Sequence, residues 1–202
     1  MNTFSQNDES VRDEILEYMN KKYNEEFTAL SLDRGYTDVL LCMIQGGDPE
    51  ADLILAQRIT GDSGVVFKDT YFGNIIREDV EFEILSVCSI LDIPMKAIYH
   101  SGASYYDNIF DGTKGYDDLK QWISDGNLFR FTVTIVLPLD AVDDSEVYAE
   151  QIYTLLSNAN YQGLAYVCIL PLEGFLEATR ANLNNLINQY HEQSITCTKS
   201  IN

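Results

Sequence analysis

Apolar residues recur at three- and four-residue steps near the start of the chain. This spacing places them on one face of a helix that runs to about Tyr23, with charged and polar residues on the other face. The apolar positions are Val11, Ile15, Tyr18 and Met19, and the side chains that can cap the helix are those of Asn7, Asp8 and Ser10.

The apolar spacing then changes to that of strands. Residues typical of turns, at 33–35 and 46–49, separate successive apolar runs, so the pattern predicts an antiparallel meander. A fourth, short strand is predicted at 65–68. The residues that follow it, up to 73, fit either a strand or a loop. The predicted strands cover 27–32, 37–45, 51–60 and 65–68.

A buried helix is predicted over 77–91, because three acidic residues open it and an apolar stripe continues through it. Pro94 follows the helix, and the segment 95–100 has the composition of a strand. A glycine-, aspartate- and tyrosine-rich stretch then leads to a short predicted helix at 119–124.

Strands and helices alternate in the last third of the chain, which is typical of a βαβα unit with two parallel strands. Both strands end in Leu-Pro-Leu followed by an acid, at 137–140 and again 33 residues later. The predicted fold class is α+β, with an N-terminal helix and meander and a mixed C-terminal sheet packed by helices. The strands cover 129–137 and 164–170, and the helices 144–159 and 175–191.

We expect one compact domain over 1–202, with two sub-units: the helix and meander at 1–101 and the βαβα unit at 127–193. The chain has 202 residues, of which 46% are hydrophobic. This length is within the usual range for a single domain, and only 4 prolines are present to form a stiff linker.

The net charge of -19 is the most unusual global feature. A surface this negative repels phosphate groups, so we expect neither nucleic acid nor an anionic membrane as a partner. A basic protein remains open as a partner. The alternative is that the acidity serves solubility alone, because net charge bears on association rather than on fold.

The four cysteines form no CxxC pair, which excludes zinc-ribbon and thioredoxin-like sites on spacing. Cys42, Cys88 and Cys168 lie in apolar runs, where a thiol behaves as a small hydrophobic group. The first residues have neither a basic start nor an apolar segment, and no apolar stretch reaches the length of a membrane span. We therefore expect a cytoplasmic protein, or an extracytoplasmic one if a leader was removed.

No motif of a common enzyme class is present. The nucleotide, hydrolase and zinc-protease signatures are missing, and the Gly-Asp-Ser-Gly at 61–64 fits a turn rather than a protease nucleophile, because both histidines follow it. His100 and His191 have no identifiable catalytic partner in the sequence. We therefore predict no catalytic residue, no cofactor and no metal site.

The carboxyl ends of the two predicted parallel strands are the first candidate site. Ligands of open α/β sheets bind at such ends, and Asp140 and Glu173 would both lie there. Together they could hold a cation or a basic side chain. The alternative is that each carboxylate only stabilises the N-terminus of the helix that follows it.

The tyrosine-rich stretch in the middle of the chain is the second candidate site. Exposed tyrosines framed by acids are typical of protein-binding surfaces. Folding of these rings onto a sheet is the alternative explanation. The candidate binding residues are Tyr105, Tyr106, Asp107, Asp111 and Tyr116.

Two short motifs resemble those of a group of small α+β proteins of Gram-positive gut bacteria, many of which carry lipoprotein leaders. The first is Lys-Lys-Tyr-x-Glu-x-Phe at 21–27, at the end of the opening helix, and the second is Asp-x-Tyr at 69–71. The resemblance covers about residues 10–100. It implies a helix followed by a sheet, and no catalytic residues.

These observations predict a non-enzymatic, acidic protein-binding domain, such as an immunity or inhibitor protein against a basic partner. The alternative is a small-molecule or cation-binding domain, or a hydrolase, with its site at Asp140 and Glu173. The sequence does not predict the oligomeric state.

Overall fold

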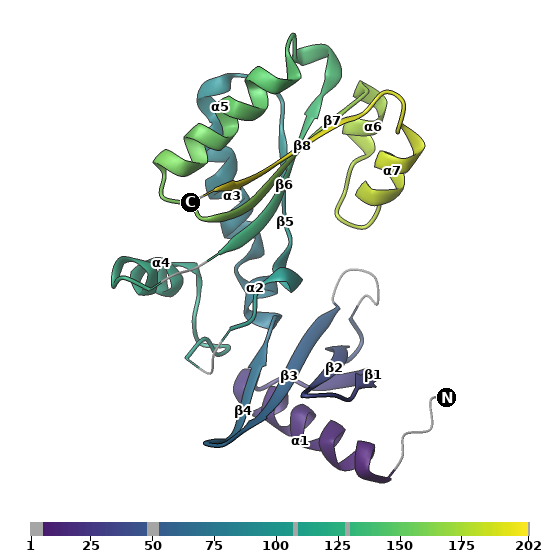
Figure 1. Cartoon of the computed structure of the whole chain (residues 1–202), viewed down its shortest axis with the longest axis vertical. Helices are drawn as coiled ribbons and strands as arrows, with labels where there is room; N and C mark the ends of the chain where they lie inside the picture. Colours follow the sequence, from purple (N-terminus) through teal and green to yellow (C-terminus); the bar gives the residue numbers. More distant parts are fainter. Residues whose placement is uncertain (1–5, 48–52, 107–108, 128–129, 202) are drawn as a thin grey trace. The chain divides into compact units, whose positions relative to one another are not determined.

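A computed structural model describes residues 6–47, 53–106, 109–127 and 130–201. The fold is α+β, as predicted, with an N-terminal helix and antiparallel sheet followed by a mixed sheet with helices (Figure 1). The chain divides into two compact units, the first formed by 1–76 and 101–119 and the second by 77–100 and 120–202. The expectation of one domain over 1–202 stays a prediction.

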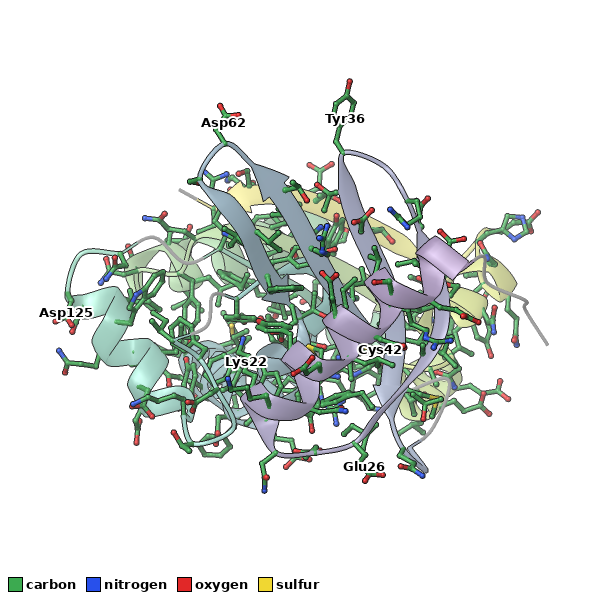
Figure 2. All side chains as sticks on the ribbon, turned by 90° about the horizontal axis from the view of Figure 1, so that it is seen from below. Lys22, Glu26, Tyr36, Cys42, Asp62 and Asp125 are labelled. Atoms are coloured by element: carbon green, nitrogen blue, oxygen red, sulfur yellow. The ribbon has the colours of Figure 1, made fainter. Side chains whose placement is uncertain are left out.

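The first unit is a helix packed on a four-stranded antiparallel meander, which confirms the predicted order. Ile15 and Met19 of helix α1 (Gln6–Tyr23) are fully buried against Leu40, Cys42 and Ile54 of the sheet. Figure 2 shows α1 lying across the strands. The strands, in spatial order, are β1 (Phe27–Asp33), β2 (Thr37–Ile44), β3 (Ile54–Gly61) and β4 (Gly64–Asp69).

A buried carboxylate joins α1 to the end of β4. Asp69 is fully buried, and its Oδ2 atom accepts hydrogen bonds from Lys22 Nζ at 2.7 Å and from the Tyr18 hydroxyl at 2.8 Å. Its Oδ1 atom accepts from the Tyr23 hydroxyl at 2.7 Å and from the Tyr71 backbone N–H at 2.9 Å. The Lys22 side chain is only 5% exposed, so this is a buried ion pair with four donors on one carboxylate.

The same residues carry the two motifs of the sequence resemblance. Lys22 and Tyr23 of the first motif bind Asp69 of the second, and the Tyr71 hydroxyl donates to Glu25 at 3.0 Å. The Phe27 ring packs edge-on against Tyr71, with ring centroids 5.2 Å apart. The two motifs therefore join the end of α1 and the start of β1 to the segment that follows β4.

The second unit is a four-stranded mixed sheet with helices on both faces. Strands β6 and β7 are parallel neighbours, as predicted, and the outer two strands pair antiparallel to them. The strand order is β5 (Lys96–Tyr99), β6 (Phe131–Pro138), β7 (Gly163–Leu170) and β8 (Ile195–Ile201).

Two helical layers cover opposite faces of this sheet (Figure 1). One face carries α3 (Arg77–Cys88), which continues into η1 (Ser89–Leu91), and α5 (Ser145–Asn158). The other carries α6 (Leu172–Glu177) and α7 (Leu183–Gln189), whose Phe175 and Leu186 pack with residues such as Cys168. The remaining helical segments are α2 (Tyr71–Ile75), η2 (Ser101–Ala103), α4 (Tyr116–Ser124) and η3 (Leu139–Ala141).

One prediction about the last third of the chain was wrong, and one strand was missed. The single helix expected over 175–191 is broken into α6 and α7, because the Asn182 side chain accepts hydrogen bonds from the Thr179 N–H and hydroxyl. The strand β8 was not predicted.

Across the described residues, no helix combines the length and the apolar character required to cross a bilayer.

We expect Lys22→Met to lower the free energy of unfolding of the first unit by about 3 to 5 kcal/mol, because it leaves the buried Asp69 carboxylate without a cation. Hydrogen exchange measured by mass spectrometry on peptides of β2 and β3 reports this stability. The exposed neighbour Lys21 provides the control, and Lys21→Met should change the stability by less than about 0.5 kcal/mol. Equal protection of the two variants would contradict the structural role of the ion pair.

Candidate functional site

The tyrosine-rich segment belongs to the first unit, and much of it packs there. The Tyr106 backbone pairs with Asp69, its N–H donating to the Asp69 carbonyl at 2.7 Å, and its buried ring lies 5.0 Å from the Phe72 ring. Phe110 is buried with them. Packing therefore explains Tyr106 without a binding role.

The other candidates in this segment have mixed surroundings. Tyr105 is 37% exposed and Tyr116, the first residue of α4, is half-buried, so their role in binding stays a prediction. Asp111 accepts hydrogen bonds from the Thr113 hydroxyl and N–H, which lower the pKa of its carboxyl and close a local turn. Asp107 lies outside the described residues.

Asp140 and Glu173 follow neighbouring parallel strands, in the topological place that the sequence predicted. Asp140 lies in η3 after β6, Glu173 lies in the first turn of α6 after β7, and both are exposed. Within the part of the chain that the structure describes, no three His, Cys, Asp or Glu side chains gather closely enough to hold a metal ion. The cation alternative therefore gains no support here.

His100 has a polar environment at the end of β5. Its Nε2 atom lies 2.8 Å from Thr134 Oγ1, and burial followed by the nearby Arg180 lowers the pKa of the ring. The Arg180 guanidinium binds Glu81 and the Tyr99 carbonyl, and Glu81 accepts the Tyr99 N–H at 2.8 Å. Thr134 is 5% exposed within the β6 strand, so the pair fits strand packing better than nucleophilic chemistry.

An apolar groove between η1 and α5 is the clearest feature of the second unit that sequence reasoning missed. It has a volume of about 690 Å³. Ile90 is 76% exposed and Val147 49% exposed at this groove, so large apolar side chains stand in solvent there. The lining residues are Ile90, Leu91, Glu146, Val147, Glu150, Gln151, Thr154 and Leu155.

Local capping positions both walls of the groove. The Asp144 side chain accepts the N–H groups of Glu146 and Val147 at 3.0 and 3.2 Å and so begins α5. Opposite, Asp92 ends η1 in a left-handed conformation with φ of 50°, which leaves Ile90 and Leu91 at the helix end. The groove therefore lies between two helical segments whose ends are fixed by hydrogen bonds.

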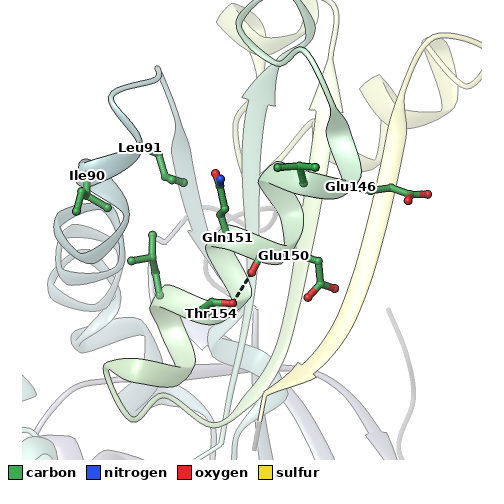
Figure 3. Close-up of a pocket in the computed structure, with 8 residues that line it drawn as sticks. Ile90, Leu91, Glu146, Glu150, Gln151 and Thr154 are labelled. Carbon is green, nitrogen blue, oxygen red and sulfur yellow. Dashed lines mark hydrogen bonds between the residues drawn. The ribbon is translucent and has the colours of Figure 1, made fainter.

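Acidic side chains border the groove along one flank. Figure 3 shows Glu146 and Glu150 on the side of α5 away from Ile90 and Leu91. Glu150 forms an ion pair with Lys199 at 2.6 Å, whereas the structure shows no cation within reach of Glu146 among the described residues. The groove thus combines an apolar floor with a carboxylate, that of Glu146, which has no cation partner among the described residues.

No protein family, curated protein or solved structure matches the chain when it is compared with them. The geometry and charge of the chain itself therefore carry the functional proposal.

The four cysteines differ in burial, and their reaction with a thiol reagent tests which thiols are accessible in the folded chain. Burial, together with the nearby Asp69, raises the pKa of the Cys42 thiol to about 12, and burial raises that of Cys88 to about 11. Burial also raises the pKa of Cys168, whereas Cys197 lies half-buried on the edge strand β8.

We expect Ellman's reagent at pH 8 to modify Cys197 at least about 100-fold faster than the three buried cysteines, because the thiolate is the reactive form of a cysteine.

Mass spectrometry of the labelled peptides identifies the modified residue, and denaturant should make all four thiols react. Rapid, stoichiometric modification of a second thiol in the native chain would show that a buried cysteine is accessible after all.

Proposed function

We propose that this chain is a non-enzymatic, acidic protein-binding domain whose partner is a basic protein. The exposed apolar groove between η1 and α5, bordered by Glu146, carries the proposal. Apolar side chains at a groove supply the desolvated centre of an interface, and the surrounding charges select the partner. Ile90 and Val147 are both exposed at this groove, so their apolar surface is available to a partner.

The overall charge supports a basic partner. A net charge of -19 accelerates the encounter with a positively charged protein and repels other acidic ones. Neutralisation of a basic toxin or nucleic-acid-binding effector, as by an immunity or inhibitor protein, is the biological role that we propose. Such a role needs a fast and specific encounter, which charge provides.

The test begins with capture of the partner by the tagged chain in cells that express it, followed by purification and stopped-flow kinetics. We expect a partner with a net positive charge and an association rate constant that falls at least about tenfold between 50 and 500 mM NaCl. Glu146→Lys should slow association, whereas the same charge change at the exposed Glu177 on α6 should have a smaller effect. An acidic partner, or association unaffected by salt, would refute the proposal.

A further inference from the structure

The shape of the groove indicates which part of a partner it accepts. Val147, Gln151 and Leu155 lie four residues apart on α5, and such i, i+4 rows form the ridges against which a neighbouring helix packs. From Glu146 to Leu155 the lining extends along about 14 Å of helix axis. That length matches about two and a half helical turns of a partner.

The opposite wall consists of Ile90 and Leu91, which gives a helix lying in the groove apolar contacts on two sides. Helices that dock in such grooves anchor through apolar residues spaced three and four apart. An extended strand would instead need backbone hydrogen bonds from a sheet edge, and the groove walls are helical segments whose backbone groups bond internally.

The charges indicate what flanks the apolar stripe of that partner. Glu146 has no cation partner among the described residues. Glu150, one helical turn further along α5, forms an ion pair with Lys199. Lysine or arginine side chains can lie with their aliphatic stems over α5 and their charged ends beside Glu146. We infer that the groove binds an amphipathic helix with an apolar stripe and a basic flank. This inference rests on the proposed function.

A second copy of the chain does not suit the groove. Each copy would bring its own Glu146 and Glu150 side chains and a net charge of -19 to the contact. Like charges brought together at an interface oppose association.

Synthetic peptides test the inference on the full chain. The main probe is an 18-residue peptide with leucines at i, i+3, i+4 and i+7 spacing and lysines along both flanks of the leucine stripe. We expect chemical-shift changes in nitrogen-15 spectra at Ile90, Val147 and Leu155. A peptide with glutamate in place of lysine should bind at least about tenfold more weakly.

Two variants of the chain separate groove binding from general attraction between opposite charges. Ile90→Gln removes an apolar contact at a side chain that is 76% exposed, and should weaken binding of the lysine peptide about tenfold. Glu146→Lys should weaken it at least as much, with the loss reduced in 500 mM NaCl. Glu177→Lys, on the opposite face of the sheet, is the control and should weaken it less than threefold. If Ile90→Gln alters the circular dichroism spectrum, Val147→Gln takes its place.

Equal binding of the glutamate peptide, or of a lysine peptide with leucines at every second residue, would overturn the inference. An unchanged affinity of the Ile90→Gln or Val147→Gln chain for the lysine peptide would also overturn it. So would self-association of the native chain that the Ile90→Gln substitution abolishes. If the purified basic partner still binds with strong salt dependence while the helical peptide does not, the proposed function stands and the helical mode of binding is rejected.

Discussion

The buried Asp69 carboxylate joins the N-terminal helix of the first unit to the end of its last strand. Asp69 has no exposed surface, so its charge requires compensation from the protein. Lys22 supplies the opposite charge, and the Tyr18 and Tyr23 hydroxyls and the Tyr71 N–H complete the hydrogen bonds. Burial, and then the Asp69 charge, raise the pKa of Tyr23, which keeps its hydroxyl a donor. Because these groups come from α1, β4 and α2, the carboxylate fixes the three elements together.

Much of the fold could be predicted from local pattern, and the failures have local causes. The helix at α1 and the strands β1 to β4 have a clear apolar period with turn residues between them, and the parallel pair β6 and β7 follows from alternation with helices. The break between α6 and α7 depends on a side chain, Asn182, that competes for backbone N–H groups, and no period shows that. Strand β8 has alternation in Ile195, Cys197 and Ile201, a signal that could have identified it.

The candidate sites were harder to predict because burial depends on tertiary packing. Tyr105 and Tyr106 are neighbours in sequence, yet only the second is buried, since it pairs with the end of β4. The groove needs Ile90 and Val147, which lie far apart in the chain. Val147 also belongs to a helix, α5, whose other apolar residues are mostly buried. The rows of α5, with Glu146 and Glu150 beside Val147 and Gln151, were visible in the sequence as four-residue steps. Only the structure shows that Val147 of this row stays exposed beside Ile90.

The contrast between the two units bears on function. Inside the first unit, a carboxylate is buried and fully paired, which stabilises structure and leaves nothing for a partner. On α5, Glu146 is exposed beside apolar side chains and is unpaired among the described residues. An exposed apolar surface on a neutral protein would promote self-association, but a chain with a net charge of -19 repels its own copies. The acidity thus opposes self-association through the exposed groove, and under the proposed function the same charge attracts a basic partner.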